Sequence, residues 1–199
     1  MQPLSACCAF IFDMDGTLTV PQHDFDAIRA ALDIPQNALI LEHLAALPAL
    51  EAKQKRQQLD ALELDIARES QPAMGLFKLL DTLRERAMPF AILTRNSADN
   101  AKASLAAIRA EHYFVDDLIV GRDEATPKPH PAGIELLARR LGHAPHLCAM
   151  VGDYRHDLQA GRSAGCHTVH VCHDGAATWP EFTDTTVNSL DHLLAELSW

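Results

Sequence analysis

The sequence has few basic residues and gathers them in one place only. Its 199 residues include 17 Lys and Arg against 27 Asp and Glu, so the formal net charge is −10. Lys53, Lys55 and Arg56 form the single tight basic group, and their spacing is typical of a solvated helix face. Binding to nucleic-acid phosphates needs clustered Lys and Arg side chains. The composition therefore argues against a nucleic-acid partner.

Long apolar runs and an ordinary disulfide pattern are also missing. No uninterrupted apolar segment is long enough to span a bilayer, so we expect no membrane partner. The residues before Phe12 include no basic residue and run directly into Asp13, which does not match a signal peptide. The five cysteines include the adjacent Cys7 and Cys8, whose positions disfavour a structural disulfide. Reduced thiols and a cytoplasmic location are therefore expected.

Histidines gather near the end of the chain, where they invite a metal-site interpretation. His167, His170 and His173 lie beside Cys166 and Cys172. This segment has the pattern of a strand, however, and a spacing of three residues places His167 and His170 on opposite faces. Zinc ligands must converge on one ion, so the spacing disfavours a shared zinc site.

Strands and helices alternate through most of the chain. Apolar runs predict strands at 9–12, 88–93, 114–120, 147–151 and 168–172. Helical patterns occupy 75–87, 97–109, 131–141, 154–164 and 190–197, whereas residues 176–189 carry no clear signal. Such alternation predicts parallel βαβ units. The expected fold is therefore α/β, with a parallel sheet flanked by helices.

A block of helices interrupts this alternation directly after the first strand. Its helical patterns span about 24–32, 37–47 and 50–69, with no strand between them, and Leu59, Leu62 and Ile66 keep the spacing of an amphipathic helix. We therefore expect residues 1–19 and 74–199 to form one α/β core and residues 20–73 to form a small all-α insertion.

Two carboxylates end the first strand. Asp13 and Asp15 follow an apolar run and precede Gly16, so a turn can bring both side chains toward one crevice. Close carboxylates repel one another unless a cation or a shared proton offsets the charge, and aspartate suits Mg²⁺ or covalent nucleophilic catalysis. Taken alone, the pair is equally compatible with a solvated turn.

Polar residues follow other predicted strands in the same way. The hydroxyl of Thr94, with Arg95 and Asn96 before a helix, forms an anion-binding pattern, and Lys128 lies between two prolines in a loop. Each of these residues alone also fits a helix cap or a loop charge. Asp153 follows a buried strand, with Asp157 one helical turn later. Because parallel strands end at one sheet edge, these groups should converge there, where they describe a phosphoryl-transfer site.

These four segments, in this order, resemble the motifs of the haloacid dehalogenase-like hydrolase superfamily. The stretch from Phe12 to Thr19 resembles the first motif and Thr94 the second, whereas Lys128 between its prolines and the stretch from Gly152 to Asp157 resemble the third and fourth. The resemblance covers nearly the whole chain. It implies a Rossmann-like core with a helical cap inserted after the first strand.

The resemblance also implies Mg²⁺-dependent phosphoryl transfer through an aspartyl-phosphate. Carried over by position, Asp13 is the nucleophile and a metal ligand, and Asp15 is the general acid and base that also contributes to the metal site. Asp153 binds Mg²⁺, and Asp157 either binds the ion too or supports the residues that bind it.

The transferring phosphate is implied to bind at the second and third motifs. The residues expected to hold it are Thr94, Arg95, Asn96 and Lys128.

Asp15 favours a phosphatase over a dehalogenase, because the dehalogenases of this superfamily do not use an acid/base aspartate two residues after the nucleophile. Lys53 and Lys55 lie in a polar helical run that would not lower an amine pKa, which argues against the phosphonate-cleaving branch. A phosphomutase and a non-catalytic binding module remain alternatives.

The expected partner is a small phosphorylated metabolite bound beneath the cap, by a monomer or homodimer. The predicted cap is shorter than the four-helix caps common among phosphoglycolate phosphatases and β-phosphoglucomutases. Basic side chains that can face the crevice are Arg29, His43, Lys53, Arg56 and Arg68, with Arg95 and Arg122 better placed after strand ends.

Overall fold

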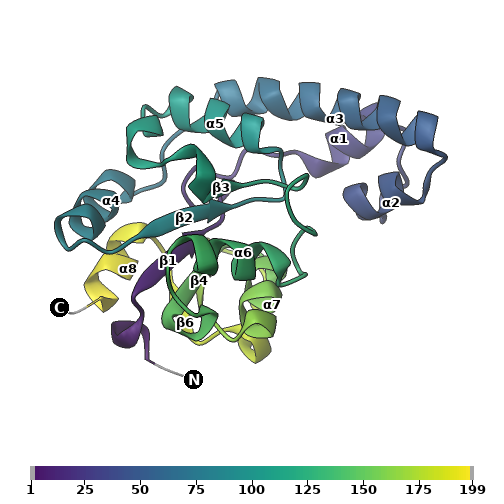
Figure 1. Ribbon diagram of the computed structural model, residues 1–199. Coiled ribbons are helices and arrows are strands. Elements are labelled where there is room, and N and C mark those ends of the chain that lie inside the picture. Colours follow the sequence, from purple (N-terminus) through teal and green to yellow (C-terminus); the bar gives the residue numbers. More distant parts are fainter. Residues whose placement is uncertain (1–2, 198–199) are drawn as a thin grey trace.

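A six-stranded parallel sheet forms the centre of the computed structural model, which describes residues 3–197 (Figure 1). The strand order is β3-β2-β1-β4-β5-β6, and every neighbouring pair is parallel. The strands are β1 (Ala9–Phe12), β2 (Phe90–Leu93), β3 (Ile119–Val120), β4 (Cys148–Gly152), β5 (His167–Val171) and β6 (Thr185–Val187). This arrangement confirms the α/β prediction.

Helices cover both faces of the sheet. Phe10 and Phe12 point into one apolar cluster, which includes α4 (Leu76–Glu85), α5 (Ala98–Ala107) and α8 (Leu190–Glu196). Ala9 and Ile11 point into a second cluster with α6 (Ala132–Arg140) and α7 (Arg155–Ala164). A strand buried on both faces needs apolar residues at every position, which explains the unbroken run that precedes Asp13.

The helical block between β1 and β2 has an apolar cluster of its own. It consists of α1 (Phe25–Ala31), α2 (Ile40–Ala46) and α3 (Ala49–Arg68), and Leu32, Leu44 and Leu59 are almost fully buried among them. In Figure 1, α3 lies over α5 and extends beyond the sheet. Backbone hydrogen bonds from Val20 to Gln71 (2.9 Å) and from Ala73 to Leu18 (3.0 Å) hold the entry and exit of the block side by side.

The three helices of the block, at 25–68, lie within the predicted insertion at 20–73. The division into a core and a cap stays a prediction, and residues 1–2 and 198–199 of the expected core lie outside the described residues.

One predicted strand was wrong in length, and one strand was not predicted. The strand expected at 114–120 is reduced to Ile119–Val120, because two 3₁₀ helices precede it and Phe114 instead packs edge-on against Phe90. The segment without a signal contains β6, a strand of three residues with a single buried position, Val187. The 3₁₀ helices are Leu4–Ala6, Glu111–Tyr113, Asp116–Leu118, Pro145–Leu147 and Pro180–Phe182.

All five cysteines are free, as the sequence predicted, but they differ in burial. Burial raises the pKa of Cys7 to about 12 and that of Cys148 to about 11, and it raises the pKa of Cys166 further. Cys8 and Cys172 are half-buried. Because the thiolate is the reactive form, we expect iodoacetamide at pH 8 to label Cys8 and Cys172 first.

Mass spectrometry of the alkylated native protein checks this prediction, with the urea-unfolded chain as the control in which all five thiols react. Labelling of Cys166 as fast as Cys172 in the native protein would contradict the burial described.

Among the helices of residues 3–197, none combines the length and apolar character needed to cross a membrane.

Candidate active site

Asp13 stands at the carboxyl end of the central strand β1. Its backbone N–H donates to the carbonyl of Val151 on β4 (2.9 Å), which continues the strand pairing to this residue. The chain then turns at Gly16, where φ is +85° and an added Cβ would lie 2.3 Å from Oδ2 of Asp153. Glycine is therefore required at position 16 both for its backbone conformation and for the close approach of Asp153.

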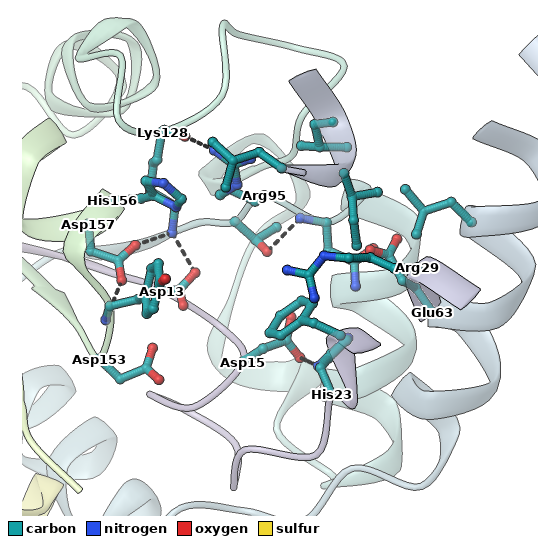
Figure 2. A pocket seen from close by; sticks show the side chains of 18 residues that line it. Asp13, Asp15, His23, Arg29, Glu63, Arg95, Lys128, Asp153, His156 and Asp157 are labelled. Carbon is teal, nitrogen blue, oxygen red and sulfur yellow. Dashed lines mark hydrogen bonds and ion pairs between the residues drawn. The ribbon is translucent and has the colours of Figure 1, made fainter. Parts of the chain in front are cut away.

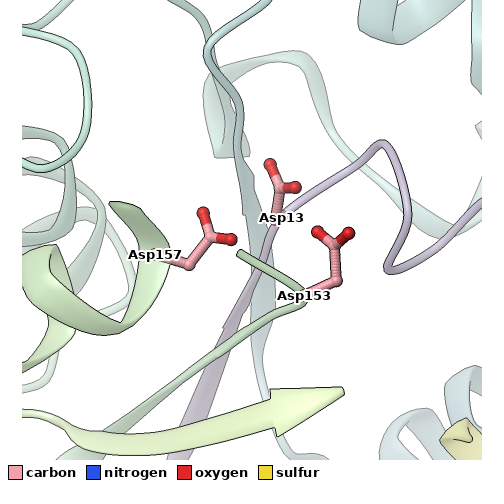
Figure 3. A group of neighbouring side chains, drawn as sticks. All are labelled: Asp13, Asp153 and Asp157. Carbon is pink, nitrogen blue, oxygen red and sulfur yellow. The ribbon is translucent and has the colours of Figure 1, made fainter. Parts of the chain in front are cut away.

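Three carboxylates meet beyond the ends of β1 and β4, as Figure 3 shows. Asp13, Asp153 and Asp157 each offer one oxygen, and these oxygens all lie within 4.8 Å of one another. Asp157 is held in the first turn of α7, where its Oδ2 accepts a hydrogen bond from the N–H of Tyr154 (3.0 Å). Gly152 allows this position, since an added Cβ would lie 2.3 Å from Cβ of Asp157.

The electrostatics of this triad suit a bound cation. Burial raises the pKa of Asp13 and of Asp153, and the repulsion of neighbouring carboxylates raises both further. A divalent cation among the three oxygens would offset that repulsion, and carboxylate oxygens are the ligands that Mg²⁺ prefers. The donor set therefore fits a Mg²⁺ ion.

Lys128 supplies a buried positive charge next to the triad. Its side chain is 2% exposed, and Nζ lies 2.5 Å from Oδ1 of Asp13 and 2.6 Å from Oδ1 of Asp157. The same ammonium donates to the carbonyl of Leu93 at the end of β2 (2.7 Å). The ammonium thus contacts the first motif, the fourth motif and the end of β2 directly before Thr94.

The segment after β2 places one hydroxyl and two side chains around the same cavity. Thr94 is 2% exposed, and its Oγ1 accepts from the N–H of Asn96 (3.0 Å), which leaves the hydroxyl proton available. The side-chain oxygen of Asn96 accepts from Ser97 (2.8 Å), so it supports the start of α5. The guanidinium of Arg95 binds the carbonyl of Lys128 and also Glu42 on α2 (2.9 Å).

Asp15 lies apart from the triad. It is half-buried, and its Oδ1 is 3.8 Å from Nδ1 of His23. Figure 2 shows both side chains beside Asp13 but on the side away from Asp157. Because Asp13 and Asp15 both line the same cavity, Asp15 can exchange a proton with a group that is bound there next to Asp13.

Comparison with known proteins identifies the family. A family model described as haloacid dehalogenase-like hydrolase matches residues 9–165. The chain belongs to this family. The segment matched runs from β1 to the end of α7, and it includes the four motifs and the helical block.

Individual relatives agree with this membership in the HAD-like hydrolases. An uncharacterized hydrolase of Saccharomyces cerevisiae is 31% identical over 98% of this chain and 92% of its own length. The phosphoglycolate phosphatase of Escherichia coli is 31% identical over 59% of this chain, but this covers only 48% of that enzyme. Among solved structures, a hydrolase from Pseudomonas syringae has a TM-score of 0.77 at 22% identity, covering 96% of this chain and 97% of its own.

The HAD-like site opens into a cavity of about 230 Å³ between the sheet edge and the helical block. All eight residues predicted to form the site line it. Of the basic side chains noted in the block, Arg29 lines it as well. Residues of the wall that sequence reasoning missed are His23, Phe25, Leu39, Ile40, Leu41, Leu59, Glu63, Tyr154 and His156.

Some of the missed residues carried a signal. Tyr154 and His156 lie inside the fourth motif. Glu63 lies four residues after Leu59 and four before Ala67, and all three are buried on the same side of α3. A carboxylate inside an apolar helical stripe is unusual enough to be noticed in a sequence.

In this HAD-like fold, Arg122 joins the helical block to the sheet. It follows β3, and its guanidinium lies 2.7 Å from Oε2 of Glu63 and binds Asp60, both on α3. The side-chain amide of Asn100 on α5 donates to the carbonyl of Asp60 (3.1 Å). Burial raises the pKa of Glu63 to about 7 against the opposing effect of Arg122.

The histidines considered for zinc have other partners. Nε2 of His167 lies 2.8 Å from Oγ1 of Thr185, and Nε2 of His170 lies 3.3 Å from the carbonyl of Asp153. Nε2 of His173 lies 2.7 Å from the carbonyl of Gly16. His170 and His173 thereby contact the two loops that carry the acidic residues.

Proposed function

We propose that this HAD-like hydrolase is a Mg²⁺-dependent phosphatase that hydrolyses a small phosphorylated metabolite through an aspartyl-phosphate on Asp13. One observation carries the proposal. The buried carboxylate of Asp13 faces both a cluster of acidic oxygens within 4.8 Å and an ammonium at 2.5 Å, at the edge of a parallel sheet where ligands bind. A carboxylate nucleophile needs such positive charge, because the phosphate that it attacks is negative.

The reaction divides into two displacements. In the first, an oxygen of Asp13 bonds to phosphorus while the bond from phosphorus to the alcohol oxygen breaks, and Asp15 donates a proton to that oxygen. In the second, Asp15 takes a proton from water, and the water oxygen bonds to phosphorus while the bond from phosphorus to the Asp13 oxygen breaks, which restores the Asp13 carboxylate and yields orthophosphate. Each step is easier than direct hydrolysis.

The remaining residues hold the groups that react. The carboxylates of Asp13, Asp153 and Asp157, together with the backbone carbonyl of Asp15, would hold Mg²⁺, which supplies charge stabilisation for the phosphoryl oxygens when bound. The hydroxyl of Thr94 and the ammonium of Lys128 would bind two of those oxygens, with Arg95 and Asn96 fixing the loop around them. The contacts of Arg95 with Glu42 and with the carbonyl of Lys128 support this positioning role.

Residues 20–73 would form the cap of this enzyme, over a core of residues 1–19 and 74–199. The separate apolar cluster of the block and its paired entry and exit support this division. We propose a cytoplasmic enzyme that acts as a monomer or homodimer.

Phosphate release from a panel of phosphorylated metabolites, with Mg²⁺ and with EDTA, tests the proposed function. We expect turnover of at least one ester that depends on Mg²⁺ and is restored when Mg²⁺ is returned. Turnover that is equal in EDTA would contradict the metal dependence. A phosphorylated isomer as the product, rather than orthophosphate, would replace the phosphatase with a mutase.

Binding of Mg²⁺ can be measured without turnover. Millimolar Mg²⁺ should raise the melting temperature, since a ligand that binds only the folded state stabilises it. Asp153→Asn should remove most of this rise, because the amide carries no charge to attract the ion. Asp174→Asn is the matched control, because Asp174 is exposed and lies outside the cavity. An equal rise in both variants would exclude Asp153 as a ligand.

A further inference from the structure

The cavity has a reaction end and a far end, and the far end must receive the alcohol part of the substrate. In Figure 2, Asp153 and Asp157 lie on one side of Asp15, whereas Arg29 and Glu63 lie on the other. The residues of the far end come from α1, α3, the start of α2 and the residue before it, so they belong to the helical block. These side chains decide which alcohol fits.

The basic side chains near the far end are already paired with carboxylates. Arg29 binds Asp26 (2.8 Å), and Arg95 binds Glu42 (2.9 Å). Arg122, behind Glu63, lies between the two acidic residues of α3 described above. In the described part of the chain, the arginines that line this cavity therefore offer no unpaired charge to a second anionic group of a substrate.

Glu63 instead offers a hydrogen-bond acceptor. Its side chain lines the cavity although the residue is only 8% exposed. Its Oε2 is buried and lies 2.7 Å from the guanidinium of Arg122, so this ion pair fixes the carboxylate at the cavity wall. A carboxylate can accept more than one hydrogen bond, so a ligand in the cavity can donate to Glu63 in addition to Arg122.

The rest of the far wall is apolar. Phe25 and Leu39 are 53% and 48% exposed, which is unusual for large apolar residues, and both face the cavity together with Leu41 and Leu59. An apolar wall with one acidic acceptor suits a compact carbon skeleton that carries hydroxyl groups. A carboxylate or a second phosphate would have no proton to donate to Glu63 and would be repelled by its ionised form.

We propose that Glu63 is a specificity residue that accepts a hydrogen bond from a hydroxyl of the leaving alcohol, so that the enzyme hydrolyses phosphate monoesters of uncharged polyols in preference to those of hydroxy acids. This inference rests on the proposed phosphatase function. The proposed substrate preference differs from the activity for which the Escherichia coli relative, a phosphoglycolate phosphatase, is named, because phosphoglycolate is the phosphate ester of a hydroxy acid.

The test compares kcat/KM for glycerol 1-phosphate and for 2-phosphoglycolate at saturating Mg²⁺, with p-nitrophenyl phosphate as a general ester. We expect the wild-type enzyme to prefer glycerol 1-phosphate by about tenfold or more, the size expected for a hydrogen bond to a charged acceptor. Glu63→Gln should lower this preference about tenfold, by raising KM for the polyol ester and lowering KM for phosphoglycolate.

Glu51→Gln is the matched control, because Glu51 lies exposed in the first turn of the same helix. Its selectivity should equal that of the wild type. An equal kcat/KM of the wild-type enzyme for phosphoglycolate and for glycerol 1-phosphate would overturn the inference. This test needs no variant, so it holds even where Glu63→Gln does not fold. An unchanged preference in folded Glu63→Gln would overturn it too.

Failure of the proposed function has a different signature. In that case none of the three esters, p-nitrophenyl phosphate included, releases phosphate in a Mg²⁺-dependent way, and the inference falls with it.

Discussion

Asp13→Asn is expected to lower kcat for phosphate release by at least about a thousandfold, the scale seen when a covalent nucleophile is removed. The amide has nearly the size of the carboxylate, but it cannot attack phosphorus. Substrate should still bind, because the hydroxyl of Thr94 and the ammonium of Lys128 remain. Single-turnover release of phosphate measures the loss, and binding of a phosphorylated substrate to the variant shows that the site is intact.

The folded state should tolerate this change. Lys128 keeps its contacts with Asp157 and with the carbonyl of Leu93, and one of three mutually repelling carboxylates becomes neutral. Asp174→Asn, at an exposed position, provides the control for the chemical change. Retention of Mg²⁺-dependent turnover by Asp13→Asn would exclude Asp13 as the nucleophile.

Lys128→Met should damage stability as well as activity. Removing one partner of a buried ion pair leaves an uncompensated charge, which typically costs about 3–5 kcal/mol. Here two carboxylates lose the ammonium that lies 2.5 Å and 2.6 Å from them. We therefore expect a free energy of unfolding lower by about 3 kcal/mol near pH 8 without Mg²⁺, and partial recovery when Mg²⁺ binds.

The loss should depend on pH in a defined direction. Without the ammonium, burial and the repulsion of neighbouring carboxylates hold the pKa of Asp13 above its value in the unfolded chain, so the folded variant binds more protons than the unfolded one. Its stability then falls as pH rises through this interval. Urea unfolding at pH 5 and pH 8 should show the smaller deficit at pH 5.

Lys102→Met is the matched control, because Lys102 pairs with Asp116, which is 81% exposed. Exposed pairs contribute little to stability, so this variant should stay within about 1 kcal/mol of the wild type. A Lys128→Met variant as stable as Lys102→Met at pH 8 would contradict the electrostatic role of Lys128.

Much of the fold could be predicted because each central strand is buried on both faces. Burial demands an unbroken apolar run, and β1 and β4 both show one. The edge strands lack this constraint. β6 has one buried position in three residues, so its sequence shows almost no apolar pattern. β3 has only two residues, which form a strand because they pair with Ile92 and Leu93 of β2.

The reaction end of the site was predictable for a topological reason. Parallel strands end on one edge, so polar residues directly after apolar runs had to converge there. The far end depends on how the helical block folds back over that edge. Helical spacing shows that Phe25 and Leu39 belong to amphipathic segments or their flanks, but it does not show whether they face the apolar cluster or the cavity.

The contact between Lys128 and Asp13 joins residues 115 positions apart in the chain. Since Asp157 contacts the same ammonium, the cluster needs nearly the whole core before it can exist. During synthesis, Asp13 therefore leaves the ribosome long before the segments that carry Lys128 and Asp157, and its contacts with them form only after those segments have emerged. Catalysis cannot begin on a partly made chain, and a nascent chain exposes no assembled site to cellular phosphate esters. Activity thus reports completed folding of the core rather than of any one segment.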